Sequence, residues 1–247
     1  MVAVGLIGAA VGSFLNVVAY RLPRGESLVA PRSRCPGCER QIAAYDNVPV
    51  ISFLVLRGRC RGCGTRISAR YPLVELLTAL VFVGIALARG VDAELALELP
   101  FAAALIALAA IDLERHVIPN RILLPVAVYG VAAAAVVAPG ELPELAIAGA
   151  ASFAVLLLVV LAHPAGMGMG DVKLAGVMGL YLGSAVVPAL LCAFLAGTVV
   201  GLGMILREGP GARKKGLPFG PFLALGGVVG LLAGPELVDL YRDSFLQ

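Results

Sequence analysis

Charged residues are scarce in this 247-residue chain, where they make up 14% of the sequence against 60% for hydrophobic residues. A soluble globular domain usually carries about a quarter charged residues, so this scarcity excludes an ordinary soluble domain. Runs of alternating polarity, which a membrane β-barrel would need, are also absent. The composition therefore predicts an all-α polytopic membrane protein.

The first twenty residues lack the marks of a cleaved secretory signal. No basic segment precedes the apolar run, and Arg21 and Arg24 follow it where a small-residue cleavage site would be expected. We therefore expect residues 1–20 to remain as the first transmembrane span.

Eight segments have the length and polarity of membrane-spanning helices. A helix needs about 20 apolar residues to cross a bilayer core of about 30 Å. The apolar run from Leu174 to Leu206 is too long for one crossing, and Gly183, Ser184 and Pro188 offer a turn that divides it. The predicted spans are residues 2–20, 72–88, 95–111, 122–138, 142–162, 172–186, 188–206 and 217–235.

Basic residues are unevenly distributed among the connecting loops. Segments 21–71, 112–121, 163–173 and 207–216 hold 17 of the 19 Lys and Arg residues, and eight spans place all four segments on one side. Because basic loops stay in the cytoplasm, we expect this side to be cytoplasmic and both termini to face outward.

Segment 21–71 is the one hydrophilic domain, and it holds four of the five cysteines, in the sequences CPGC and CRGC. Two such turns can complete a tetrahedral four-thiolate site typical of structural zinc, with no coordination position left for a substrate. Disulfides or free thiols are the alternatives, but a reducing cytoplasmic side disfavours disulfides. The predicted zinc ligands are Cys35, Cys38, Cys60 and Cys63.

Two further features of this domain bear on its partners. Its ten arginines would also suit a nucleic-acid-binding ribbon, but cytoplasmic loops of membrane proteins are basic in any case, so no nucleic-acid partner is expected. Residues 48–56 are largely apolar and too short to cross a bilayer, and we expect them to pack under the zinc loop or to lie on the membrane surface.

The expected organisation therefore has four parts. These are a first span at 1–20, a cytoplasmic zinc-binding domain at 21–71, a seven-span bundle at 72–235 and a short C-terminal tail at 236–247.

Three acids, Glu75, Asp112 and Asp171, lie at membrane depth, where ionisable side chains are costly and mark functional candidates. Asp112 closes the third span and Asp171 opens the sixth, so alternating topology places both at the cytoplasmic end. Two converging, partly desolvated carboxylates share a proton, which is the chemistry of an aspartyl protease. The alternative is a pair of interfacial acids, one bound to Lys173 and one to Arg115.

The sequence around each aspartate adds a local expectation. The helix that carries Asp112 is expected to continue until Pro119. Gly166, Gly168 and Gly170 precede Asp171, and their lack of side chains would let a substrate backbone approach and let the loop adopt positive φ. A plain interhelical turn is the alternative.

Six stretches, taken in order and spacing, resemble the type 4 prepilin peptidase family over nearly the whole chain. The chain begins almost at its first span, where members often have extra residues. The stretches are GSFLNVVAYRLP (12–23), DNVPVISF (46–53), CRGCGTRISARYPLVELL (60–77), DLERHVIPN (112–120), GMGDVKLAG (168–176) and LPFGPFLALGG (217–227).

This resemblance implies a GxGD-type intramembrane aspartyl protease of the bacterial cytoplasmic membrane, with Asp112 and Asp171 as the catalytic pair. Its partners would be membrane lipid and its protein substrates, the precursors of type IV pilins and of pilin-like secretion subunits. These are cut at the cytoplasmic face just before their apolar stem. The family then methylates the new N-terminal amine with S-adenosylmethionine, and members with the four-cysteine loop tend to have both activities.

Other residues of these stretches are expected to support the site. Gly168 and Gly170 would admit the substrate, and Lys173 would hold a catalytic carboxylate, meet an acid of the pilin, or simply extend to the interface. Glu75 is expected to be structural, with a contribution to methyl transfer as the alternative. Asn47 is a candidate for contact with the methyl donor.

The sequence leaves two alternative functions open. No glycine-rich nucleotide fingerprint follows a strand, so the methyl-donor site is not located and the chain could be a protease only. A transporter with intramembrane acids as proton relays and a zinc-braced gate is the alternative outside the enzymes.

Overall fold

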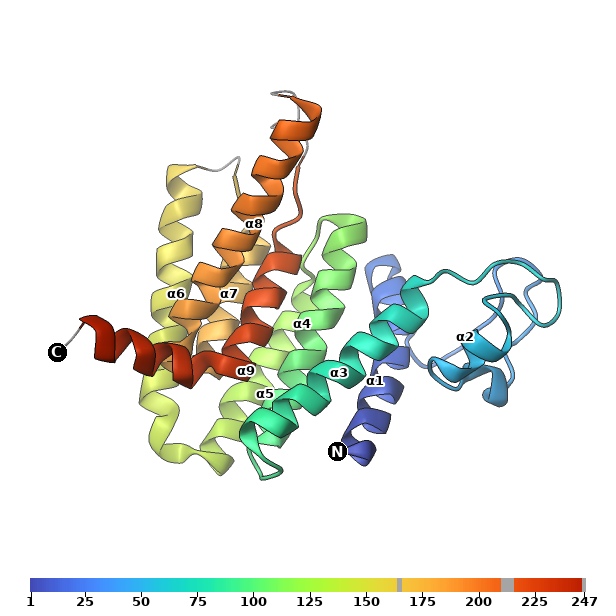
Figure 1. The fold of residues 1–247 in the computed structure, drawn as a ribbon, viewed down its shortest axis with the longest axis horizontal. Helices are drawn as coiled ribbons and strands as arrows, with labels where there is room; N and C mark the ends of the chain where they lie inside the picture. Colours follow the sequence, from blue (N-terminus) through green and yellow to red (C-terminus); the bar gives the residue numbers. More distant parts are fainter. Residues whose placement is uncertain (164–165, 210–215, 246–247) are drawn as a thin grey trace. The chain divides into compact units, whose positions relative to one another are not determined.

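The described structure, a computed structural model, covers residues 1–163, 166–209 and 216–245. In that part of the chain it contains helices and two isolated β-bridges but no longer strand (Figure 1). The chain divides into two compact units, Met1–Leu87 and Ala88–Gln247. The predicted all-helical architecture is confirmed.

Seven helical stretches among the described residues are long and apolar enough to cross a membrane. One of them, Met169–Glu208, has 40 residues, a length of about 60 Å that is twice the bilayer core. The 3-10 turn η4 (Gly183–Ala185) divides it into α7 (Met169–Leu182) and α8 (Val186–Glu208). Gly183 has φ of +53°, which a glycine adopts without strain. The eight predicted helices are therefore all present, with the break near Gly183 and Ser184.

The first unit is built on close packing of α1 (Val2–Arg21) against α3 (Arg70–Arg89). A Cβ atom at Gly8 would lie 2.8 Å from Ala79 Cα, and one at Gly12 would lie 2.7 Å from Glu75 Cα. These glycines let two backbones approach as small residues do in membrane helix pairs. One turn further along α1, buried Asn16 donates its Nδ2 hydrogen to the carbonyl oxygen of Tyr71.

The hydrophilic loop of this unit contains three short helices, η1 (Leu22–Arg24), η2 (Ala44–Asn47) and α2 (Ile51–Val55). In α2 the side chains of Ile51, Leu54 and Val55 are all more than half exposed. They are therefore not packed under the cysteine loop. An apolar, exposed surface of this kind fits the other expectation, a position at the membrane surface.

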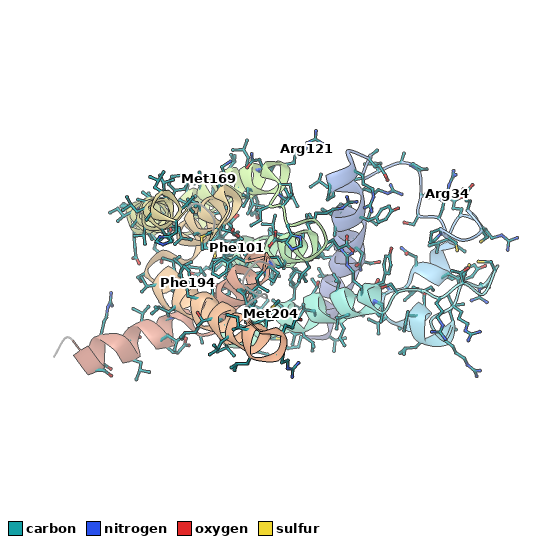
Figure 2. The ribbon with its side chains drawn as sticks, turned by 90° about the horizontal axis from the view of Figure 1, so that it is seen from above. Arg34, Phe101, Arg121, Met169, Phe194 and Met204 are labelled. Atoms are coloured by element: carbon teal, nitrogen blue, oxygen red, sulfur yellow. The ribbon has the colours of Figure 1, made fainter. Side chains whose placement is uncertain are left out.

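The second unit consists of α4 (Leu95–Arg115), α5 (Asn120–Val137), η3 (Pro139–Glu141), α6 (Leu142–Ala162), α7, α8 and α9 (Gly220–Phe245). Helices α4 and α7 are rich in fully buried side chains and contact each other and α9. Phe101 of α4, labelled in Figure 2, stacks on Tyr181 of α7 with ring centroids 4.1 Å apart. The centre of this unit is therefore formed around α4 and α7.

Glycines also set the spacing of the outer helices in this unit. A Cβ atom at Gly179 of α7 would lie 2.5 Å from the carbonyl oxygen of Ala148 in α6, and one at Gly226 of α9 would lie 2.1 Å from that of Ala189 in α8. Larger residues would force both helix pairs apart.

Two prolines inside helices leave a carbonyl without its helical donor, and a side chain replaces that donor each time. Pro100 cannot donate to Ala96, and the Tyr129 hydroxyl donates to the Ala96 carbonyl at 2.5 Å. Pro235 likewise cannot donate to Leu231, whose carbonyl accepts from Arg89 Nε at 2.9 Å. Buried helices in an apolar medium tolerate proline when neighbours satisfy the freed groups in this way.

Two helix ends differ from the expected ones. Helix α4 ends at Arg115 because His116 is left-handed, with φ of +54°, so the expected continuation to Pro119 is wrong. Helix α9 bends at Ala233, two residues before Pro235, and runs on to Phe245, past the predicted end of the span at 235 (Figure 1). The basic residues Arg213, Lys214 and Lys215 of the preceding loop lie outside the described residues.

Candidate active site and metal centre

Asp112 lies in the last turn of α4 and is 5% exposed. Its Oδ2 accepts a hydrogen bond from the backbone N–H of Gly220, the first residue of α9, at 2.9 Å. The two residues are 108 positions apart in the chain. The start of α9 therefore fixes the position of this carboxyl.

Asp171 lies in the first turn of α7 and is 8% exposed. Its Oδ2 accepts the backbone N–H of Gly168, the residue that caps the helix, at 3.0 Å. A carboxylate at this position satisfies a backbone donor that the helix itself leaves unpaired. The GxGD sequence thus encodes its own anchor for the acid.

The two aspartates lie in the same compact unit, on helices α4 and α7, and these helices pack against each other. Both side chains are buried, and such a pair cannot ionise twice at low cost. The arrangement can therefore hold one shared proton and supply both an acid and a base to a bound substrate.

Two of the glycines before Asp171 make contacts that the sequence did not indicate. Neither Gly168 nor Gly170 has positive φ, so the expected positive φ is wrong at these two positions. A Cβ atom at Gly170 would lie 2.9 Å from Ile118 Cβ, in the link between α4 and α5. Gly170 thus permits close packing of this link on α7, and Gly168 supplies the N–H donor to Asp171.

Lys173 has a hydrogen-bond partner that the sequence did not indicate. Its Nζ donates to Oδ1 of Asn120, the first residue of α5, at 3.2 Å. The contact joins the two motifs DLERHVIPN and GMGDVKLAG. Asn120 follows Pro119 at the start of a helix. A polar residue at such a position was the one sequence signal that could have marked Asn120 as a site residue.

The four loop cysteines converge, as predicted, in two turns of the same construction. The N–H of Gly37 lies 3.4 Å from Cys35 Sγ, and the N–H of Gly62 lies 3.4 Å from Cys60 Sγ. One β-bridge flanks each turn, Arg34 to Gln41 and Arg59 to Arg66. Arg34 is labelled in Figure 2.

The sulfur atoms have the spacing of a four-thiolate metal site. All four Sγ atoms lie within 4.8 Å of one another, with Cys35 and Cys63 3.7 Å apart and Cys38 and Cys60 4.0 Å apart. A tetrahedron with Zn–S bonds of about 2.3 Å has edges of about 3.8 Å. A disulfide would need about 2.05 Å, and all four cysteines are free. The residues therefore fit zinc.

The segment between the two turns is held at two points near its middle. Asp46 and Arg61 form a two-pronged ion pair with a shortest distance of 2.7 Å, and the guanidinium holds the pKa of Asp46 below its usual value. Glu75, buried in α3, accepts the backbone N–H of Val50 through Oε2 at 2.7 Å. These contacts fit the expected structural role of Glu75.

Asn47 lies with Glu75 in the first unit, whereas Asp112, Asp171 and Lys173 lie in the second. Asn47 is exposed and lines a cavity of about 330 Å³ beside the end of α1. Among the described residues, the charged side chains lining this cavity are Arg21 and Arg32. S-adenosylmethionine carries a carboxylate beside its two cationic groups, so the two arginines neither exclude nor identify it as the occupant. Asn47 stays a candidate for contact with the methyl donor.

The described features define a polytopic helical membrane protein with a buried pair of aspartates and a four-cysteine loop. Residues 6–89 match the family model described as Bacterial Peptidase A24 N-terminal domain, and residues 99–204 match that of the Type IV leader peptidase family. The chain belongs to the type IV leader peptidase family.

Similar curated proteins extend over nearly the full chain. The prepilin leader peptidase/N-methyltransferase of Aeromonas hydrophila is 38% identical over 98% of this chain and 93% of its own length. Proteins of the same name from Dichelobacter nodosus and Bacillus subtilis are 37% and 35% identical over 96% of this chain, and 93% and 95% of their own lengths. No solved structure matches the chain.

Proposed function

We propose that this protein is an aspartic endopeptidase that removes the leader peptides of type IV prepilins and pilin-like secretion proteins. The observation that carries the proposal is the pair of buried aspartates, Asp112 and Asp171, each anchored by a helix N-terminus in one helical unit. The names of the relatives supply the substrate class.

Each aspartate takes one half of the proton transfer. The ionised carboxylate removes a proton from a water molecule, whose oxygen forms a bond to the scissile carbonyl carbon. The protonated carboxyl gives its proton to the carbonyl oxygen. Collapse of the tetrahedral intermediate breaks the C–N bond, and the amine leaves with a proton from the carboxyl that took one from water. The other carboxyl takes back its proton from a hydroxyl of the intermediate as the new C=O bond forms, so the pair returns to its starting state. One water is consumed, and one acid and one amine are formed.

The substrate fits a site at the end of a helical bundle. A prepilin has an apolar helical stem that can lie among the spans, while its short basic leader stays among the loops. The distribution of Lys and Arg favours a cytoplasmic position for these loops in a bacterial inner membrane. We therefore place the aspartates and the cysteine loop on the cytoplasmic side, with membrane lipid around the spans and no nucleic-acid partner.

The cysteine loop is proposed to hold one structural zinc ion. Cys35, Cys38, Cys60 and Cys63 would occupy all four positions of a tetrahedral site. Bound zinc would supply rigidity to the loop, because closed four-thiolate sites contribute to folding and leave no position for a substrate.

A second activity, methylation of the new N-terminal amine with S-adenosylmethionine, is proposed from the names of the relatives. Those relatives are named as peptidase and N-methyltransferase together, and this chain keeps all four loop cysteines. The mass of the mature pilin N-terminus tests this activity: a correctly cut pilin with an unmethylated amine would leave a protease only.

Single substitutions of the aspartates test the peptidase. We expect Asp112→Asn and Asp171→Asn each to lower cleavage of a co-expressed prepilin by about 10²-fold or more, because each acid performs a separate proton transfer. Asp239→Asn, at an exposed position on α9, is the matched control and should cleave normally. Normal processing by either active-site variant would disprove the aspartic mechanism and favour a transporter with intramembrane acids.

A further inference from the structure

The first turn of α9 offers a single backbone donor that no helical carbonyl accepts. The N–H groups of Phe222 and Leu223 both donate to the carbonyl of Phe219, and Pro221 has no N–H. The N–H of Gly220 is left, and it donates to Oδ2 of Asp112. The sequence FGPF therefore presents one donor, aimed at one of the two aspartates.

The same residue has no room for a side chain. A Cβ atom at Gly220 would lie 2.7 Å from Oδ2 of Asp112 and 3.0 Å from both its Cβ and its Cγ. Since the Cβ of Asp112 is fixed to the backbone of α4, rotation about χ1 alone would not relieve the contact. Asp112 would have to leave its place.

We propose that Gly220 is a positioning residue of the peptidase: its N–H holds Asp112 in the orientation for proton transfer, and its missing side chain leaves space for that carboxyl. The inference rests on the proposed aspartic mechanism. The bond uses one of the two acceptor positions of Oδ2 of Asp112, and it leaves Oδ1 without this backbone donor and therefore better able to exchange a proton with water or substrate. The N–H of Gly168 likewise donates to Oδ2 of Asp171 and so anchors that carboxyl.

The two anchors differ in origin. Gly168 lies three residues before Asp171 in the same turn of chain, whereas Gly220 reaches Asp112 from a helix that begins 108 positions later. Helix α9 packs against both α4 and α7. The hydrogen bond to Asp112 therefore depends directly on the position of α9, whereas the hydrogen bond to Asp171 is formed within α7 and its cap.

The experiment compares Gly220→Ala with two glycine controls in the full-length protein, with cleavage of a prepilin measured in detergent micelles. A Cβ atom at Gly216 would meet no atom of the described residues within 4 Å, and one at Gly226 would strike the backbone of α8 at 2.1 Å without contacting Asp112. We expect Gly220→Ala to lower kcat by about 10²-fold with KM unchanged, because a small displacement of a catalytic group has that effect. Gly216→Ala should keep normal kcat and KM, and Gly226→Ala should lower thermal stability.

A normal kcat in Gly220→Ala would overturn the inference. Asp112→Asn in the same assay separates this failure from failure of the aspartic mechanism, which would show as cleavage by Asp112→Asn itself. If Gly220→Ala does not fold, the double variant with Asp112→Gly decides, because it removes the Cβ, Cγ and Oδ2 atoms that the new methyl group would meet. A melting temperature equal to that of Asp112→Gly alone would support the contact with Asp112, and a double variant that is much less stable than Asp112→Gly would overturn it.

Discussion

At the scale of single residues, the bundle depends on side chains that replace missing backbone donors. Tyr129 and Arg89 bind the carbonyls that Pro100 and Pro235 leave unpaired. In an apolar surrounding each unpaired carbonyl has a substantial energetic cost. Each of these side chains completes the hydrogen bonding of a helix other than its own.

The Tyr129 contact can be measured by a double-mutant cycle. We expect Tyr129→Phe to lower the free energy of unfolding by about 0.5–1.5 kcal/mol, the net value of one hydrogen bond. In a Pro100→Ala background the new N–H can donate to Ala96, so the same change should cost less. Equal costs in both backgrounds would show that the hydroxyl contributes nothing through Ala96.

The anchoring of the aspartates is also a matter of single residues. Asp112 and Asp171 were predicted as a pair from their places at the ends of two spans, and the structure places them on two helices that pack against each other, while their catalytic role stays a proposal. The hydrogen bond that anchors Asp171 could be inferred from GxGD, because donor and acceptor lie in one turn. The hydrogen bond that anchors Asp112 could not be inferred, since no local pattern says which distant N–H will reach it.

At the scale of elements, the two CxxC turns are nearly equivalent but are packed differently. A Cβ atom at Gly37 would lie 2.6 Å from Oγ1 of Thr65, in the opposite turn, whereas one at Gly62 would meet its neighbours at 3.5 Å or more. Of the two glycines, only Gly37 is packed so closely against the opposite turn that an added Cβ atom would not fit. Equivalent glycines in repeated turns therefore have unequal importance.

This asymmetry gives a matched pair of variants. We expect Gly37→Ala to weaken zinc retention, because the added methyl group separates the two turns, and Gly62→Ala to change it little. Competition with a chromogenic chelator measures both. Adding Thr65→Ala should restore retention in Gly37→Ala, and failure to do so would show that the contact with Thr65 is not the cause.

Some helix boundaries could be predicted from the sequence and others could not. The break between α7 and α8 was predicted, because a 33-residue apolar run from Leu174 to Leu206 exceeds one crossing and contains turn residues. The end of α4 was not, because His116 adopts a left-handed conformation that only a small fraction of non-glycine residues adopt, so no local signal marked this residue as the helix end. Gly170 was assigned to substrate access, and only packing against Ile118 revealed its other role.

At the scale of the whole molecule, the chain forms two compact units, one with the cysteine loop and one with the aspartates. If zinc supports only the first, its removal should act unevenly. We expect chelation to release about one zinc ion per chain and to open residues 25–69 to limited proteolysis, while α4 to α9 stay protected. Mass spectrometry of the fragments measures both regions, and parallel loss of protection in the two would contradict independent units.

The sequence by itself determined the membrane class, the helices, the cysteine cluster and the two acids as candidates, because hydrophobic runs, CxxC spacing and buried charge are local or compositional signals. The tertiary structure decided which groups hold them. Gly220 reaches Asp112 from 108 positions away, and Lys173 meets Asn120 across 53. Such contacts depend on which helices pack together in three dimensions, and no local pattern in the chain says which distant residues will meet.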